Sequence, residues 1–242
     1  MTRLLLINPN TTQSITDLVL KHAKSFAAKG TTLRAISGAF GPRYIASRIG
    51  YAIAGHAAVD ALANDRGTRD AVVLACFGDP GLAALKEVSK VPVVGMAEAS
   101  ILQACAIGRR FSIVTGGERW KAMLEEFVAA QGMSPRLASV RTVAPTGADI
   151  ARNPKAAMAL LAKGCSACAR EDGADVVILG GAGLAGLAAK LRAAVDVPLL
   201  DGVACAISMA EALARQKPAK SGTAAPPVES VGLSKGLAKL IG

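Results

Sequence analysis

Residues 71–81 read AVVLACFGDPG, a short aliphatic run that passes directly into a turn rich in glycine and proline. An aliphatic run of this length, bounded by turn residues, is typical of a strand buried on both faces. Helical periodicity follows from Leu82 to Val88. The stretch therefore predicts a strand, a turn and a helix in succession, which is the repeating unit of a parallel α/β sheet.

The same pattern recurs 105 residues later (176 against 71), where residues 176–186 read VVILGGAGLAG. The alignment pairs Leu82 with Leu187, and a gap of one residue pairs Val91-Pro92 with Val197-Pro198. An internal repeat of this length indicates two similar lobes.

We expect residues 1–100 and 207–242 to form the first lobe with a C-terminal tail, and residues 101–206 to form the second lobe. Each lobe is predicted to hold a mostly parallel sheet flanked by helices, so the fold class is α/β with two pseudo-symmetric lobes. In such sheets ligands bind at the carboxyl ends of the strands, which here places the active site in the cleft between the lobes. Further strands are predicted at residues 4–7, 91–94, 111–114 and 197–200.

Composition excludes several classes of protein. With 52% hydrophobic and 19% charged residues in a chain of 242, wholesale disorder is excluded. The longest uncharged apolar stretch, residues 176–189, is shorter than the ~18 residues that a membrane span needs. The apolar run near the N-terminus is too short for a secretory signal, and the odd count of five cysteines fits a reducing compartment. We therefore expect a cytoplasmic protein with no membrane partner.

The net charge is +10, from 28 Lys and Arg against 18 Asp and Glu, but the chain has no block of consecutive basic residues. Nucleic-acid binding is therefore not favoured, although strong salt-dependent affinity for DNA would be its signature. The charge fits attraction of an anionic small substrate better.

Four predicted strand ends carry distinctive residues, and all four are expected to meet at one site. They are the stretches NPNTT at 8–12, CFGDPG at 76–81, TGG at 115–117 and GGAG at 180–183. The side-chain amide of Asn10 could hydrogen-bond a carboxylate or imide of a ligand, or Asn10 could serve only as a turn residue. The hydroxyl of Thr115 and the backbone N–H groups that follow it, from Gly116 on, could bind an anion, or the stretch could be a plain strand–helix turn.

Cys76 is the strongest catalytic candidate. We expect Asp79 to cap the helix that follows, with the N–H groups of Phe77 and Gly78 exposed nearby. A helix N-terminus lowers the pKa of a thiol, so this setting favours a thiolate able to act as a base. The alternative is an inert buried cysteine.

Cofactor and metal motifs are weak. Gly181, Gly183 and Gly186 match the spacing of a dinucleotide-binding loop, but no acidic strand end follows at the usual distance. Neither histidine has a partner nearby in the sequence, and the pair Cys165 and Cys168 stands alone, so no metal site is predicted.

Together these segments resemble the aspartate/glutamate/hydantoin racemase superfamily, most closely its hydantoin and allantoin racemase branch. The stretches that carry the resemblance are INPNTT at 7–12, GPRYI at 41–45, ACFGDPGL at 75–82, VPVVGM at 91–96 and VPLLDGV at 197–203. The resemblance implies no cofactor, a homo-oligomer, and two cysteines that remove and return a proton on opposite faces of a carbon acid. It implies substrate binding by Asn10, Thr115 and Gly116, and we expect Phe77, Gly78 and Ala182 to contact the substrate as well.

The sequence departs from that family at the second cysteine, where it has Gly181. The internal repeat independently pairs Cys76 with Gly181. Glycine can neither accept nor donate the proton that two-base racemization requires on the second face.

Three hypotheses follow. The first is a racemase-type or epimerase-type isomerase acting on a hydantoin, an allantoin or an amino-acid-like substrate, with Cys76 as base and acid and with impaired or one-sided activity. The second is a one-cysteine decarboxylase or isomerase of a small carboxylic acid, a use of cysteine that the resemblance to arylmalonate decarboxylase and maleate isomerase implies. The third is a family member that only binds its small-molecule ligand.

Overall fold

The computed structural model describes residues 1–143, 153–219 and 226–242. Within them the chain forms two four-stranded sheets with the orders β2-β1-β3-β4 and β6-β5-β7-β8, and every neighbouring pair of strands is parallel. The strands are β1 (Thr2–Asn8), β2 (Thr31–Ser37), β3 (Ala71–Leu74), β4 (Val93–Gly95), β5 (Phe111–Gly116), β6 (Leu137–Val143), β7 (Val176–Gly180) and β8 (Leu199–Asp201).

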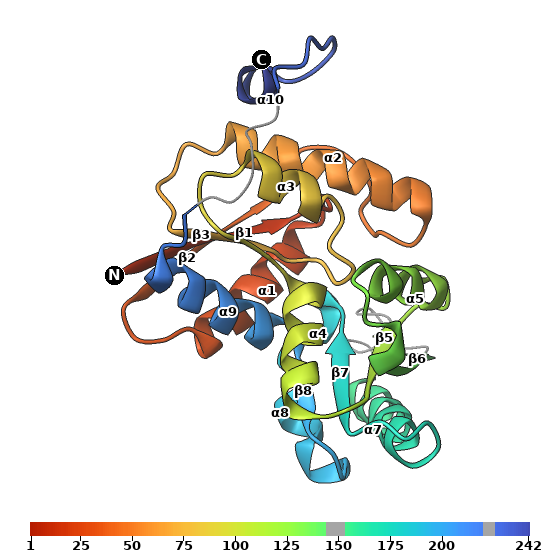
Figure 1. Cartoon of the computed structure of the whole chain (residues 1–242). Coiled ribbons are helices and arrows are strands. Elements are labelled where there is room, and N and C mark those ends of the chain that lie inside the picture. Colours follow the sequence, from red (N-terminus) through yellow and green to blue (C-terminus); the bar gives the residue numbers. More distant parts are fainter. Residues whose placement is uncertain (144–152, 220–225) are drawn as a thin grey trace.

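Helices flank both sheets, and α4 lies between them (Figure 1). The helices are α1 (Gln13–Phe26), α2 (Arg48–Asn64), α3 (Leu82–Val88), α4 (Met96–Ile107), α5 (Trp120–Ala130), α7 (Pro154–Arg170), α8 (Ala188–Leu191), α9 (Gly202–Gln216) and α10 (Lys235–Ile241), with 3-10 turns at Ser134–Arg136, Ala182–Leu184 and Arg192–Ala194. No helix in the described part of the chain is long and apolar enough to cross a membrane.

The central strands of the first sheet are buried on both faces. Leu4 and Leu6 of β1 join one hydrophobic cluster, whereas Leu5 and Ile7 join another on the opposite face. The first of these clusters continues through α4 and α9 to Ile113 and Ile178 of the second sheet. The two sheets therefore share a continuous core, which explains why β1 and β3 read as unbroken aliphatic runs.

The predicted α/β fold with two pseudo-symmetric lobes is confirmed. Leu74 of β3 pairs with Gly95, and Leu179 of β7 pairs with Asp201, so the repeat found in the sequence occupies equivalent positions of the two sheets. The division of the chain after residues 100 and 206 stays a prediction, because these positions lie inside α4 and α9, which contact both sheets.

The strands β2 and β6 and the helix α2 were not predicted. The edge strands β2 and β6 are mostly half-buried, so their sequences lack long aliphatic runs. Helix α2 is rich in alanine and is buried without a clear apolar stripe. Thr12 precedes α1, and its hydroxyl donates to the carbonyl oxygen of Arg43 at 2.7 Å without capping the helix.

The ring of Phe77 joins the two lobes. A Cβ atom built at Gly180 would lie 2.5 Å from Cε1 of Phe77, and one built at Gly202 would lie 3.3 Å from its Cδ2. Because Phe77 is buried, the ring has little room to move away. Glycine at residue 180 is thus a condition for close packing of the lobes.

We predict that Gly180→Ala lowers the free energy of unfolding by about 1–3 kcal/mol, because the added methyl group overlaps the ring of Phe77. In a Phe77→Leu background the same substitution should cost much less, since the overlapping ring atoms are absent. Urea unfolding of the two single variants and the double variant measures this coupling. Equal costs in both backgrounds would contradict the packing described here.

Candidate active site

The structure brings the four predicted strand ends together. The N–H of Ala75 donates to the carbonyl oxygen of Ile7 at 2.8 Å, so Asn10 and Cys76 follow adjacent strands. The Phe77 ring reaches Gly180 in the other lobe. A Cβ atom at Gly181 would lie 3.8 Å from the hydroxyl oxygen of Thr115.

Cys76 lies in a tight turn that immediately follows β3. The N–H of Asp79 donates to the carbonyl oxygen of Cys76 at 3.0 Å, which closes the turn. Gly78 adopts φ +110°, and a Cβ atom there would lie 2.7 Å from the ring of Trp120, so both its backbone and its surroundings require glycine. The hydroxyl of Tyr51, on α2, donates to the carbonyl oxygen of Gly78 at 2.7 Å. The turn is thereby held from both lobes.

Several hydrogen-bond donors around this turn have no acceptor among the described residues. They are the backbone N–H groups of Phe77, Gly78 and Ala182, and the Nδ2 of Asn10. Oδ1 of Asn10 accepts from Asn8 at 3.0 Å and from the N–H of Thr12 at 2.9 Å, which fixes the amide. Such donors suit an anionic or carbonyl oxygen of a ligand.

The end of β5 supplies the other lobe's polar groups. Thr115 is 4% exposed, and its hydroxyl makes no hydrogen bond to another described residue. Gly116 ends the strand and pairs with Val143. Gly117 adopts φ +85°, and a Cβ atom there would lie 2.9 Å from the hydroxyl oxygen of Tyr44, which reaches this point from the first lobe.

The protonation state expected for Cys76 was wrong. Burial is the main cause of a raised pKa of this thiol, and the negative charge of Asp79 raises it further. Asp79 also does not cap the following helix: α3 begins at Leu82 after Gly81, without a side-chain cap. Cys76 is therefore a thiol at neutral pH, not a thiolate.

Asp79 instead caps α4, the helix between the lobes. Its Oδ1 accepts from the N–H of Ala97 at 3.0 Å, and its Oδ2 accepts from the N–H of Glu98 at 2.8 Å. Burial raises the pKa of Asp79 to about 7, against these backbone donors, which lower it. Asp79 adopts φ +52°, and a side chain at Gly95 would collide with its carboxylate. The turn, the end of β4 and the start of α4 are thus built around one carboxyl group.

Gly181 follows β7 with φ +143° and ψ 134°, a conformation that L side chains rarely adopt. There is space beside it, since the nearest atoms to an ideal Cβ lie 3.7 Å away on Leu184 and 3.8 Å away on Thr115. Neither side chain is a conventional acid or base.

Comparison with known proteins identifies the family of this chain. The family model described as Asp/Glu/Hydantoin racemase matches residues 4–210. The chain belongs to the Asp/Glu/hydantoin racemase family. It is 37% identical over 209 residues to a hydantoin racemase of Pseudomonas sp. (strain NS671), covering 86% of this chain and 84% of that protein.

A hydantoin racemase of Paenarthrobacter aurescens is 36% identical over 213 residues, covering 87% of this chain and 90% of the relative. Among solved structures, the allantoin racemase of Pseudomonas fluorescens superposes with a TM-score of 0.91 at 32% identity, covering 96% of this chain and 100% of the other. The chain is thus a racemase-type member of this family.

Three residues of this racemase-family site were not singled out from the sequence. Tyr51 holds the Cys76 turn, and Trp120 fills the space over Gly78. Burial raises the pKa of Tyr51 to about 12, so its hydroxyl stays a donor. Tyr44 lies within the stretch 41–45 that carried the resemblance, but it had no assigned role. The spacing of Tyr44 and Tyr51, on a loop and on an unpredicted helix, gave no local signal.

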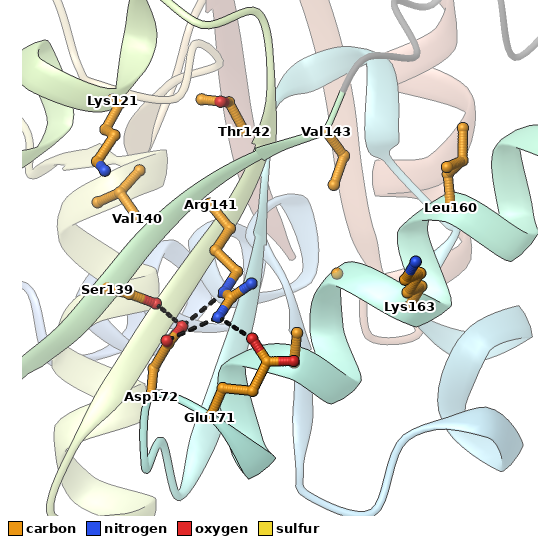
Figure 2. A pocket seen from close by; sticks show the side chains of 12 residues that line it. Lys121, Ser139, Val140, Arg141, Thr142, Val143, Leu160, Lys163, Glu171 and Asp172 are labelled. Carbon is orange, nitrogen blue, oxygen red and sulfur yellow. Dashed lines mark hydrogen bonds and ion pairs between the residues drawn. The ribbon is translucent and has the colours of Figure 1, made fainter.

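A separate surface hollow lies away from the strand ends. A hollow of roughly 750 Å³ runs between β6 and α7, where Arg141 pairs with Asp172 and Glu171 (Figure 2). Arg141, Glu171 and Asp172 pair with one another, whereas Lys121 and Lys163 form no ion pair with a described residue, and the lining contains no cysteine. We therefore assign the active site to the strand ends. In residues 1–143, 153–219 and 226–242 there is no cluster of three His, Cys, Asp or Glu side chains that could hold a metal ion.

We predict that stability depends on pH through Asp79. Its pKa of about 7 exceeds the ordinary carboxyl value of 3.8, so between these values the native protein binds a proton that the unfolded chain has released. The free energy of unfolding should therefore fall as pH rises from about 4 to about 7. In Asp79→Asn this contribution is absent.

Chemical unfolding of both proteins between pH 4 and 8 tests the sign. The stability of the wild type should decline relative to that of Asp79→Asn as pH rises. Parallel curves would contradict the raised pKa.

Proposed function

We propose that this family member exchanges the proton at the acidic carbon of a hydantoin, an allantoin or an amino-acid-like substrate, and that it does so mainly on one face. The observation that carries the proposal is the single cysteine at the strand ends: Cys76 lies beside unsatisfied N–H donors, whereas Gly181 has the equivalent position in the second lobe. This arrangement supplies an acid–base group to one face of a carbon acid.

In the proposed reaction the thiolate of Cys76 takes the proton from the acidic carbon, so that a C–H bond breaks and an S–H bond forms. The electron pair moves to the adjacent carbonyl oxygen. The N–H groups of Phe77 and Gly78 and the Nδ2 of Asn10 would stabilise that oxyanion. A thiolate with a raised pKa is scarce at neutral pH but is a strong base when formed. The S–H group then exchanges its proton with solvent, and return of the new proton from Cys76 to the same face of the carbon completes exchange with retention of configuration.

The remaining part of the substrate would be bound from the second lobe. Thr115 and Gly116 at the end of β5, and the N–H of Ala182 after β7, are the proposed contacts. Their hydroxyl and backbone groups complement the carbonyl and N–H groups of a cyclic ureide. We further propose that the enzyme is cytoplasmic and homo-oligomeric and needs no cofactor.

A second candidate is decarboxylation of a small dicarboxylic acid. The protonated state of Cys76 favours it, because loss of carbon dioxide creates a carbanion without a base and then needs only one proton donor. Release of carbon dioxide from a 2-substituted malonate that depends on Cys76 would support this reaction. Tight binding of a hydantoin with neither reaction would indicate a protein that only binds.

We predict that Cys76→Ser lowers the rate of deuterium incorporation at the acidic carbon by about 10²–10⁴-fold, the contribution of a positioned acid–base group. Cys105→Ser is the matched control, because Cys105 is a half-buried cysteine of α4 outside the site. Proton NMR in heavy water on a panel of hydantoins and allantoin measures the rate. Equal rates in Cys76→Ser and the wild type would remove Cys76 from the mechanism.

We predict that Gly181→Cys raises the rate of inversion by about 10²–10⁴-fold, because it provides the missing acid–base group. The substitution should also cost about 1–3 kcal/mol of stability, since φ +143° strains any side chain. Gly181→Ala carries the same strain without a thiol and should show no gain. Chiral chromatography of the product compares the variants, and equal inversion by Gly181→Cys and Gly181→Ala would contradict the two-face argument.

A further inference from the structure

In each lobe a carboxylate caps a helix that contacts both sheets, α4 in the first lobe and α9 in the second. The two carboxylates come from different positions of the repeat. In the second lobe Asp201 ends β8, and its carboxylate accepts from Val203 and Ala204 at the start of α9 and from Gly186 in the loop after β7. The equivalent position in the first lobe is Gly95, as the strand register shows. There the carboxylate comes instead from Asp79, in the loop after β3.

This exchange of positions brings a carboxylate into the turn that carries the cysteine. Asp79 is three residues from Cys76 and closes the turn with its own N–H, and its carbonyl oxygen accepts from the N–H of Leu82 at 3.1 Å. The same residue accepts from two N–H groups of α4. A single residue therefore connects the Cys76 turn with the helix that spans the lobes.

The surroundings keep this carboxylate in place. Asp79 is 1% exposed, and Gly95 leaves the space that its carboxylate occupies. The ionisable groups that face the Asp79–Cys76 pair are Tyr44, Tyr51 and Glu98. Lys86 is paired with Glu98. None of these groups supplies an unpaired positive charge beside the thiol.

We propose that Asp79 is the positioning residue of the site, fastening the Cys76 turn to α4 and raising, beyond the effect of burial, the pH at which Cys76 changes from proton donor to proton acceptor. The inference rests on the proposed role of Cys76 in proton transfer. The negative charge of Asp79, in the same turn as the thiol, disfavours the thiolate, so the resting enzyme holds Cys76 as a donor. Substitution of a simple structural cap would leave the thiol unchanged.

The test is a pH titration of the protein labelled with [3-¹³C]cysteine, in which the Cβ signal of Cys76 is assigned by its absence in Cys76→Ser. In the wild type the signal should stay at the thiol position to above pH 9. In Asp79→Asn, which keeps one acceptor oxygen but loses the charge, the midpoint should fall by at least about one pH unit. Asp201→Asn removes the matching cap of the second lobe and should leave the midpoint unchanged.

An unchanged midpoint in Asp79→Asn, or an equal shift in Asp201→Asn, would overturn the proposal. Should Asp79→Asn not fold, the wild type still decides: its Cys76 signal should show a small inflection near pH 7, where the charge of Asp79 develops. A signal that is flat through that range would contradict the link. Because no substrate is present, failure of the proposed function, read as absent proton exchange, is a separate result.

Discussion

The contact on which the site depends is the ring of Phe77 against Gly180 and Gly202. The ring crosses from the turn after β3 to the ends of β7 and the start of α9, and it fits only because both positions lack a side chain. It sets Cys76, directly before Phe77, opposite Gly181, directly after Gly180. The relation between Cys76 and Gly181, the two positions that the repeat pairs, therefore follows from packing between the lobes.

The pseudo-symmetry of the fold makes its departures informative. Both sheets have the same strand order and register, yet the first lobe carries a thiol and a buried carboxylate where the second carries Gly181 and Leu184. A racemase-type site with two equivalent faces would be expected to keep the chemistry of its halves alike. The asymmetry places a thiol with a raised pKa in the first lobe and leaves, at the equivalent position of the second lobe, an open space bounded by Thr115 and Leu184.

Much of the fold could be predicted from aliphatic runs, because β1, β3, β5 and β7 are buried on both faces. The half-buried strands β2 and β6 and the alanine-rich α2 have weak local signals, and they were missed. At the site, the strand-end residues were predicted together, but the partner of Asp79 was not. A cap on α4, 18 residues along the chain from Asp79, is a tertiary contact that no local spacing encodes. The expectation of a Cys76 thiolate was wrong for the same reason. Burial and the negative charge of Asp79 raise the pKa of the thiol more than a helix N-terminus lowers it.

We propose that Cys76 acts on only one face of the acidic carbon of the substrate. This proposal is tested most directly by following deuterium incorporation and enantiomeric composition together, in heavy water, from each pure enantiomer of a substrate that the enzyme accepts. We expect rapid exchange of the proton at the acidic carbon of one enantiomer, with retention of configuration, and much slower inversion. Exchange of both enantiomers accompanied by inversion at equal rates would contradict it, because a second acid–base group would then serve the face beside Gly181.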